Sequence, residues 1–362
     1  MEAARLRARP SPLEPWGGHN QPPMTRLVFD HLTNWITAAA SEHSHDLVAH
    51  VEERTGASHR AVLSALKRLV DAGWLVRSGT SRRPVFAPGG LRQVVRSYTL
   101  FGLQEDLPWQ RDFAPHFALP RHVERMIQHG FTELVNNAAD HSGGTSVTVS
   151  LRQTPTHVQL LVSDDGIGVF DKICTAFQLE DPQHAMLELS KGRLTSAPDA
   201  HTGRGLFFSS QLADVFDIHA NNTAYQRRAW ESSGWRKGRA LPRQGSSIYM
   251  AIALNTTRTL DGVMNAWSRA GDGIEFDQTR VQLRLLTTEG QALDSRAAAR
   301  RVGLRLTTFK RAEIDFDGVV DVGHGFTDEL FRVFAKANPG IELVATNMTP
   351  RIEALIRSAR AG

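Results

Sequence analysis

Four side chains that could bind a metal ion or move a proton follow one another near the middle of the chain: Glu133, Asn137, Asp140 and His141. Their spacing is i, i+4, i+7 and i+8, so a helix would present them as one polar stripe. An acid, an amide, a second acid and an imidazole in a row can position a metal ion and a water molecule. A solvated helix face would produce the same stripe, and this stretch alone leaves the two interpretations even.

The polar stripe ends a helical pattern that begins near Arg121. Apolar residues recur along the same stretch at helical spacing: Ile127, Phe131, Leu134, Val135 and Ala138. We therefore expect one long helix, with one face in the core and a second face that carries the reactive side chains as far as Ser142.

Two glycine-containing motifs follow the helix. Residues 163–168 read Ser-Asp-Asp-Gly-Ile-Gly and end a strand-like run, and residues 202–206 read Thr-Gly-Arg-Gly-Leu and open another helical run. The ordered set Glu-x-x-x-Asn, Asp-x-Gly-x-Gly and Gly-x-Gly-Leu resembles the GHKL ATPase superfamily. That superfamily includes gyrase, a major heat-shock chaperone, histidine kinases, MutL and the anti-sigma-factor kinases. The resemblance covers about residues 121–255 and implies the α/β sandwich called the Bergerat fold, with ATP and Mg²⁺ as ligands.

The resemblance implies an adenine-binding end of the site. Asp164 would accept a hydrogen bond from the adenine amino group, because a rigid carboxylate favours a donor and hence adenine over guanine. Gly166 and Gly168 would let the nucleotide approach the backbone. Ser246 matches the hydroxyl that joins the adenine contact through water.

The resemblance also implies a phosphate-binding end. Asn137 would coordinate Mg²⁺ through its side-chain oxygen, and Glu133 would activate the attacking water or hydroxyl. Backbone N–H groups at a helix N-terminus would receive phosphate; the residues of this turn are Thr202, Gly203, Arg204, Gly205 and Leu206. On the first helix, the expected nucleotide contacts are Asn136, Asn137, Asp140 and His141.

His141 points to one branch of the superfamily. Asn followed four residues later by His is the pattern of the anti-sigma-factor kinases, whereas gyrase-type members lack it and histidine kinases usually carry Lys or Arg nearby. His141 would either touch phosphate or cap the helix. A phosphoacceptor histidine of the histidine-kinase type is not recognisable, because His122 and His129 lie inside the nucleotide-binding helix.

The rest of this region predicts a sheet and a lid. Strands are expected over residues 147–151, 157–162, 216–220 and 248–254, and a helix over 203–215. Residues 170–200 should form the mobile lid over ATP between the two glycine motifs. An exposed hairpin over 225–243 would be either a second anion-binding surface or a solvated loop; its basic residues are Arg227, Arg228, Arg236, Lys237 and Arg239.

The N-terminal part predicts a disordered tail over residues 1–23 and a DNA-binding domain. Residues 24–90 show two helices, a basic third helix and a basic hairpin, an order that resembles a winged helix-turn-helix domain. Contacts to duplex DNA, mostly to phosphate, would come from Arg60, Lys67, Arg68, Arg77, Arg82 and Arg83. The alternative is a winged helix used for protein contact or dimerisation, so the protein could also be a homodimer.

Residues 91–120 would connect the domains, with a strand or short helix over 91–100 and an aromatic segment over 106–120 that packs on the ATPase domain.

The C-terminal part, residues 281–362, alternates strands and helices. Its pattern Asp-Phe-x-Gly-Val followed by Phe-x-Asp-Glu-Leu resembles the STAS-like domain of unknown function found behind some GHKL domains, over about residues 285–350. Any small α/β domain is the alternative. Thr327 is the hydroxyl nearest the expected helix start, and two acidic residues follow it, so we expect a docking or dimerisation module that is not a phosphoacceptor.

Composition bounds the class of protein. A chain of 362 residues, 41% hydrophobic and 22% charged, suits two or three globular domains. The single Cys174 excludes an internal disulfide and suits a reducing compartment. With no recognisable signal peptide and no apolar run long enough for a bilayer, we expect a cytoplasmic protein and not a membrane-bound sensor. The net charge is +4 and the pI about 9.5, so a nucleic-acid partner rests on local basic patches.

These expectations combine into a multidomain α/β protein with a mostly helical winged helix, a GHKL sandwich and a small STAS-like domain. The favoured function is an ATP-hydrolysing switch that couples nucleotide state to DNA binding in transcription regulation. The first alternative is a Ser/Thr kinase of a partner-switching system, in which Glu133 activates a hydroxyl of a protein partner docked through the STAS-like domain. The second is a scaffold that binds ATP without turnover, and Glu133 argues against it.

Overall fold

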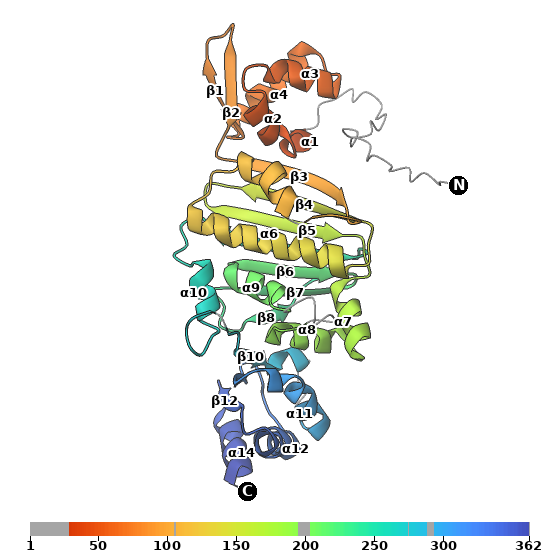
Figure 1. The fold of residues 1–362 in the computed structure, drawn as a ribbon, viewed down its shortest axis with the longest axis vertical. Helices are drawn as coiled ribbons and strands as arrows, with labels where there is room; N and C mark the ends of the chain where they lie inside the picture. Colours follow the sequence, from red (N-terminus) through yellow and green to blue (C-terminus); the bar gives the residue numbers. More distant parts are fainter. Residues whose placement is uncertain (1–28, 105, 195–202, 274, 288–292, 362) are drawn as a thin grey trace, which may run out of the picture.

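The computed structural model of the protein is elongated, with a small unit at each end of a large central sheet (Figure 1). It describes residues 29–104, 106–194, 203–273, 275–287 and 293–361. The predicted tail over residues 1–23 and Thr202 lie outside the described residues. The mixed α/β architecture agrees with the fold class expected from the sequence.

Helices and strands alternate along most of the chain. The α-helices are α1 (Phe29–Thr33), α2 (Ile36–Glu42), α3 (Leu47–Thr55), α4 (His59–Asp71), α5 (Asp106–Pro108), α6 (Arg121–His141), α7 (Val169–Phe177), α8 (Pro182–Lys191), α9 (Gly205–Leu212), α10 (Leu260–Asn265), α11 (Arg296–Gly303), α12 (His324–Asp328), α13 (Ala335–Ala337) and α14 (Pro350–Ala361). The π-helices are η1 (Trp109–Phe113) and η5 (Glu329–Phe334), and the 3-10 helices are η2 (Ala114–His116), η3 (Leu283–Leu286) and η4 (Leu306–Thr308). The strands are β1 (Leu75–Gly79), β2 (Pro84–Pro88), β3 (Arg92–Thr99), β4 (Ser146–Gln153), β5 (His157–Asp164), β6 (Val215–Ala220), β7 (Thr223–Arg228), β8 (Trp235–Lys237), β9 (Ser246–Ala253), β10 (Gln278–Gln282), β11 (Arg311–Asp315) and β12 (Glu342–Thr346).

The N-terminal unit is built around α3 and α4. Gly56 ends α3 in a left-handed conformation with φ of 66°, and Ser58 caps α4, as predicted, by accepting a hydrogen bond from the backbone N–H of Ala61 (3.4 Å). A buried cluster that includes Ile36 and Leu69 ties the helices to the hairpin. The hairpin pairs β1 and β2 antiparallel and extends away from the central sheet (Figure 1).

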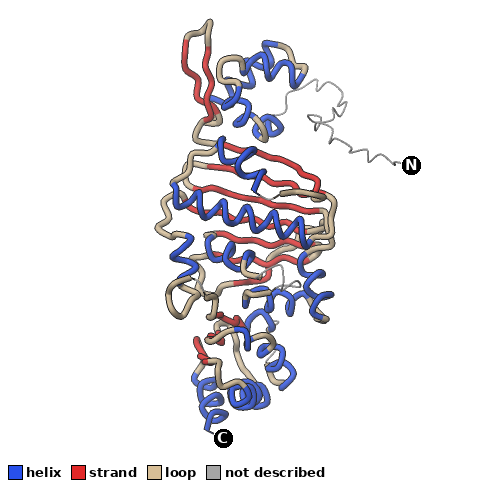
Figure 2. The backbone as a smooth tube through the Cα atoms, viewed as in Figure 1, coloured by secondary structure: helices blue, strands red, loops and turns tan. Residues whose placement is uncertain are grey.

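The central sheet has the strand order β3-β4-β5-β9-β6-β7-β8, and every neighbouring pair is antiparallel. Alternate residues of β4 are buried, because successive side chains of a strand point to opposite faces. Helix α6 lies along one face of the sheet (Figure 2), and the apolar stripe predicted for this helix lies in the core. The strands predicted from the sequence in this region are confirmed as β4, β5, β6 and β9.

Strand β3 joins the N-terminal unit to the central sheet. Of the strand and the short helix considered for residues 91–100, the structure has the strand. The backbone N–H of Val95 donates to the carbonyl oxygen of Asn34 (3.0 Å), and the backbone N–H of Gln93 donates to Thr37 Oγ1 (2.9 Å). The outer edge of the sheet is therefore covered by the junction of α1 and α2, which removes an edge open to pairing with other chains.

The aromatic segment over residues 106–120 packs on α6, as predicted. The ring centroids of Trp109 and Phe113 lie 5.3 and 5.0 Å from the ring centroid of Phe131, in edge-to-face arrangements. Both side chains are buried. Such aromatic contacts stabilise a packed interface beyond the apolar area that they bury, so this segment belongs to the core of the central domain.

The C-terminal unit, residues 275–361, contains the parallel sheet β10-β11-β12. Parallel strands need crossover connections, and helices α11 and α12 supply them between the strands, with α14 closing the unit. Phe326 and Ile352 bury their side chains between these layers. The alternation of strands and helices predicted for this part of the chain is thus confirmed.

The lid expected over residues 170–200 is only partly a loop, and this expectation needs correction. The chain forms α7 and α8, and every residue from Ala185 to Lys191 is buried. Met186, Leu187 and Leu189 join the hydrophobic core, so α8 is a packed element and not a free cover. Residues 195–200 of the predicted lid lie outside the described residues.

The hairpin expected over residues 225–243 forms as β7 and β8, but its first two arginines do not face solvent. Arg227 donates to the carbonyl oxygen of Ser210 (2.8 Å) and to Gln211 Oε1 (3.0 Å), and burial lowers the pKa of Arg227 to about 10. Arg228 pairs with Asp217 (2.5 Å). The prediction of a second anion-binding surface is therefore wrong for Arg227 and Arg228, because both guanidinium groups already bond to neighbouring elements.

Candidate functional site

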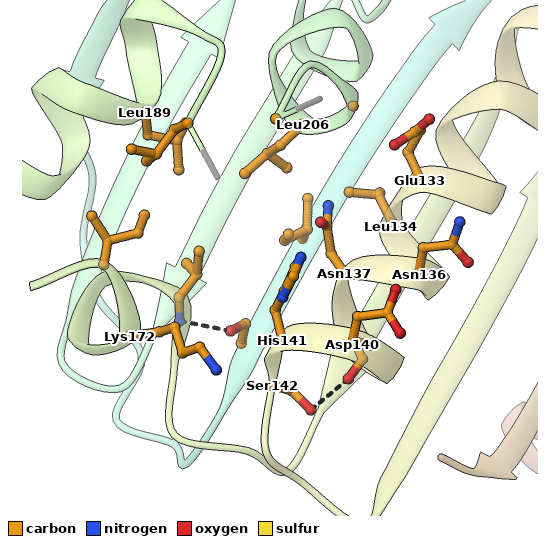
Figure 3. Close-up of a pocket in the computed structure, with 18 of the residues that line it drawn as sticks. Glu133, Leu134, Asn136, Asn137, Asp140, His141, Ser142, Lys172, Leu189 and Leu206 are labelled. Atoms are coloured by element: carbon orange, nitrogen blue, oxygen red, sulfur yellow. Dashed lines mark hydrogen bonds between the residues drawn. The ribbon is translucent and has the colours of Figure 1, made fainter. Parts of the chain in front are cut away.

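A pocket of about 320 Å³ opens between α6, α7 and the start of α9, at the ends of β5 and β9 (Figure 3). Most of the residues predicted for the site line it: Glu133, Asn136, Asn137, Asp140, His141, Asp164, Gly168, Gly203, Arg204, Gly205, Leu206 and Ser246. Gly166 is not among the lining residues, and Thr202 is outside the described part of the chain. Apolar side chains such as Val162 and Ile248 complete the walls.

Asp164 ends β5 and is 8% exposed. Its Oδ1 accepts hydrogen bonds from the backbone N–H groups of Gly166 (2.9 Å) and Ser246 (3.1 Å). Ser246 in turn accepts a hydrogen bond at Oγ from the backbone N–H of Val169 (3.0 Å). Two strands and the glycine turn therefore hold one carboxylate oxygen, and the rigid carboxylate offers its other oxygen to a hydrogen-bond donor in the pocket.

Asn137 carries a buried polar atom without a partner. In the described residues, no protein group bonds its Nδ2, although leaving a buried amide unpaired is costly. Figure 3 places the side chain beside His141 and Leu206, facing into the pocket, whereas Asn136 projects from the opposite flank of α6. Because Nδ2 is a donor, it fits a hydrogen-bond acceptor on a ligand in the pocket; the side-chain oxygen of Asn137 is the atom that could bind a magnesium ion.

Glu133 lies against the first turn of α9. A Cβ atom built on Gly205 would stand 1.7 Å from Glu133 Oε2, so any larger residue would displace this carboxylate. A carboxylate at a helix N-terminus is electrostatically favourable. Helices α6 and α9 thus bring an acid and a row of backbone N–H groups to the same end of the pocket.

Lys172 is a lining residue that sequence reasoning did not find. Its side chain rises from α7 on the wall opposite His141 (Figure 3), and within the described residues it forms no ion pair. With Arg204, it adds positive charge to a pocket whose lining also includes the carboxylates of Glu133, Asp140 and Asp164, so the pocket offers both cations and acids to a ligand. The only signal in the sequence was its position shortly after the first glycine motif.

Asp165 and Asn221 hold the first glycine motif in place, and neither role was expected. Asp165 accepts hydrogen bonds from the side chain and backbone of Thr145 and Ser146, at 2.6 to 2.9 Å. These bonds, led by the Thr145 hydroxyl, keep the pKa of Asp165 well below its ordinary value.

Asn221 sits in the turn between β6 and β7 with φ of 49°. It donates to the carbonyl oxygen of Ile167 (2.9 Å) and to Asp171, and it accepts from the backbone N–H of Gly245 (3.1 Å). A Cβ on Gly168 would lie 2.6 Å from its Nδ2. Asn tolerates this backbone conformation better than most residues, and that preference was the available signal.

The polar stripe on α6 does not form a complete metal-binding site by itself. No group of three or more His, Cys, Asp or Glu side chains that could hold a metal ion occurs in the described residues. A magnesium ion in this pocket would therefore need ligand oxygens beside Asn137, which agrees with an ion held partly by the phosphates of a nucleotide.

The six basic residues predicted to contact DNA are all exposed. Arg60, Lys67 and Arg68 stand on α4, and Arg77, Arg82 and Arg83 stand on β1 and the following turn. None of them forms an ion pair with another described residue, while the Arg68 guanidinium stacks 5.0 Å from the centroid of the Phe29 ring. These residues lie on elements that do not cover β3, so the junction with the central sheet leaves them accessible.

Comparison with known proteins identifies two parts of the chain. Residues 107–226 match the model of the histidine kinase-like ATPase domain, and residues 298–353 match that of the STAS-like domain of unknown function. Sensor histidine kinase YvrG of Bacillus subtilis (strain 168) is 33% identical over 92 residues, which are 25% of this chain and 14% of that kinase. The chain therefore carries a histidine kinase-like ATPase domain followed by a STAS-like domain, as its motifs predicted. Among the helices that the structure describes, none has the length and apolar character needed to cross a membrane.

Proposed function

We propose that this protein is a regulator that binds and hydrolyses ATP in its central pocket and couples nucleotide state to DNA binding by its N-terminal unit. The observation that carries the proposal is the convergence of the described residues of three motifs on one pocket. The buried Nδ2 of Asn137, which no described residue bonds, supports a bound ligand in that pocket.

The adenine would lie at the Asp164 end. Backbone N–H groups bond Oδ1, and Oδ2, which no described residue bonds, would accept one hydrogen bond from an exocyclic amino group. Guanine presents a carbonyl at the corresponding position and would meet a carboxylate of like polarity. Asp164 is therefore expected to select adenine.

The phosphates would lie between α6 and the start of α9. Asn137 would contribute a ligand to Mg²⁺, and the ion would neutralise phosphate charge. Gly203 to Leu206 would present backbone N–H groups at the N-terminus of α9, and Lys172 and Arg204 would add positive charge. The sensor histidine kinase that resembles this chain over 92 residues supports a nucleotide as the ligand.

Glu133 would serve as the general base. It lies against Gly205 at the same end of the pocket as the proposed phosphate seat. A carboxylate there can accept the proton of a water molecule as that water attacks the terminal phosphate. Positioning and charge stabilisation by the surrounding donors would supply the rest of the rate acceleration.

A protein kinase is the second candidate function. It is favoured by His141, which stands four residues after Asn137, and by the STAS-like domain behind the pocket. In that case Glu133 would activate a hydroxyl of a partner protein. The STAS-like domain of the same chain is an unsuitable acceptor, because Thr327 is 1% exposed and donates to the carbonyl oxygen of His324 (3.1 Å).

DNA binding would use α4 and the hairpin β1–β2. Their six basic side chains are exposed, and a steep loss of affinity with salt is expected if they meet phosphates. Hydrogen bonds from β3 to Asn34 and Thr37 give the sheet a direct link to this unit, so a change in the central domain has a path to the DNA-facing elements.

Incubation of the full chain with radiolabelled ATP and Mg²⁺ separates these functions. Hydrolysis is supported if the unmodified protein releases free phosphate and the Glu133→Ala variant still binds ATP but no longer releases phosphate. Transfer of label to an added partner protein from a cell extract supports the kinase. If neither occurs, although ATP binds, the pocket is a nucleotide sensor and the role proposed for Glu133 is wrong.

A further inference from the structure

Helix α8 is shared between the nucleotide pocket and the C-terminal unit. Leu189, near its end, lines the pocket, while the same helix packs on β10 and η3 (Figure 1). The chain then runs through Gly192 to Leu194, which also lines the pocket. One wall of the pocket is therefore built on an element that the C-terminal unit contacts directly.

A buried ionic cluster crosses this boundary. Glu188 and Lys191 are 2% and 0% exposed, and the ammonium of Lys191 donates to Glu188 Oε1 (2.6 Å) and to the carbonyl oxygen of Leu304 (2.8 Å). Arg305 donates to the second oxygen of Glu188 (3.1 Å). Loss of Arg305 would leave Glu188 paired with Lys191 of its own helix, but it would remove the hydrogen bond to Glu188 Oε2 inside a buried site, which is costly. The C-terminal unit therefore completes the hydrogen bonding of a buried carboxylate on α8.

Two arginines, one on each side of the same boundary, donate hydrogen bonds to backbone carbonyl oxygens on the other side. Arg305 donates to the carbonyl oxygens of Gly192 (3.2 Å) and Arg193, and Arg193 donates to the carbonyl oxygen of Thr308 (2.6 Å). Both arginines have left-handed backbones, with φ of 60° and 53°. Residues with a side chain rarely adopt this region and keep it where the surrounding contacts require it. The reciprocal bonds are such contacts.

An aromatic cluster extends the boundary to the start of α9. Phe207 and Phe208 follow the second glycine motif, and their ring centroids lie 4.7 and 5.0 Å from that of Phe276. Phe276 lies 5.5 Å from Phe309. Gly192 fits tightly against the cluster, since a Cβ there would lie 2.6 Å from the Phe276 ring. The start of α9, where we propose that phosphate binds, and the end of α8 thus pack against the same aromatic cluster.

We infer that the C-terminal unit is a working part of the nucleotide site and that Arg305 is its positioning residue. Arg305 holds α8 through Glu188 and holds the chain at residues 192–193 through the backbone. These segments carry Leu189 and Leu194 of the pocket wall. The inference rests on the proposed nucleotide binding and gives the STAS-like domain a role within its own chain. Its docking sets the affinity for ATP, and by reciprocity ATP strengthens its docking.

The test is the dissociation constant of ATP, measured by calorimetry with Mg²⁺ on the full chain at a temperature where all variants are folded. Arg305→Ala should raise the constant by ~10-fold or more, and Arg305→Lys should recover part of the loss because it keeps a cation. The matched control is Arg357→Ala, an exposed residue whose partner Glu353 is also exposed and lies on the same helix, α14 (2.8 Å); it should leave the constant unchanged. A merely structural role would lower the melting temperature of Arg305→Ala and leave the affinity of the folded protein intact.

Hydrogen exchange of the unmodified protein provides a second readout that needs no variant to fold. Saturating ATP should slow amide exchange over residues 304–309, which contact α8 and the 192–193 segment. If the unmodified protein binds ATP, but Arg305→Ala binds it equally well and exchange over 304–309 does not change, the inference is overturned. If the unmodified protein does not bind ATP, the proposed function fails and this inference fails with it.

Discussion

Replacing Gly205 by alanine should disable turnover through a single contact. The new Cβ would stand 1.7 Å from Glu133 Oε2, whereas carbon and oxygen atoms approach to only about 3.3 Å. The carboxylate must therefore retreat by about 1.6 Å. Since the clash falls on the end of a flexible side chain, Glu133 can rotate, and the cost to the fold should stay near 1 kcal/mol.

The expected effect on hydrolysis is far larger than the effect on stability. A displacement of about 1 Å at a reacting group costs ~10²-fold in rate, which is about 2.7 kcal/mol of barrier. Steady-state phosphate release by Gly205→Ala should fall by at least that factor. The control is Gly340→Ala, where a methyl group meets no atom within 4 Å and the rate should not change.

A double-mutant cycle makes the test specific. In a Glu133→Ala background the carboxylate is gone, so Gly205→Ala should cause little further loss of rate. Full activity of the single Gly205→Ala variant would refute the reasoning. A second ~10²-fold loss on top of Glu133→Ala would refute it too, because it would mean that the glycine acts independently of the acid.

Three further expectations follow from the other parts of the molecule. The double variant Arg82→Ala, Arg83→Ala should bind duplex DNA more weakly than the unmodified chain, by a similar factor for all sequences, and its salt dependence should fall by ~2 counterions. Gel shifts at several salt concentrations would measure both effects. Binding equal to that of the unmodified chain would favour a hairpin used for protein contact. Because burial lowers the pKa of His116, the unfolded chain takes up the proton first, and the free energy of unfolding should fall as the pH drops below about 6.5. His116→Gln should lose part of that fall in melts between about pH 7.5 and 5.5, and an unchanged profile would remove His116 as a cause. Intact mass after incubation with Mg-ATP should show no addition of ~80 Da, the mass of a phosphate group, on the buried Thr327, and a stoichiometric addition there would put the kinase function first.

The sequence predicted what local patterns control. Helix α6 and its two stripes follow from spacing alone, and they appear within a residue of the expected ends. Asp164 could be placed because a strand and a glycine turn flank it. In each case the residues that determine the structure are near neighbours in the chain.

Contacts between distant residues were beyond that kind of reasoning. Asn221 reaches Ile167 across 54 positions, and Arg305 reaches Glu188 across 117. Neither the positive φ of Arg305 nor the complete burial of Lys191 is signalled by residue type, because both residues ordinarily occur in exposed, right-handed positions. The predicted lid failed at α8 for the same reason: the helix packs on β10 and η3, which are distant in the sequence, and its Glu188 is bonded by Arg305 across 117 positions.

Calorimetric titration of the full chain with ATP and Mg²⁺, set beside Asp164→Asn and a titration with GTP, tests the central claim most directly. A single ATP site, weakened by ~10-fold or more in Asp164→Asn and with little affinity for GTP, is the predicted result, because one good hydrogen-bonded contact distinguishes the two bases. Equal binding of ATP by Asp164→Asn, or no binding by the unmodified protein, would contradict the assignment of this pocket to ATP.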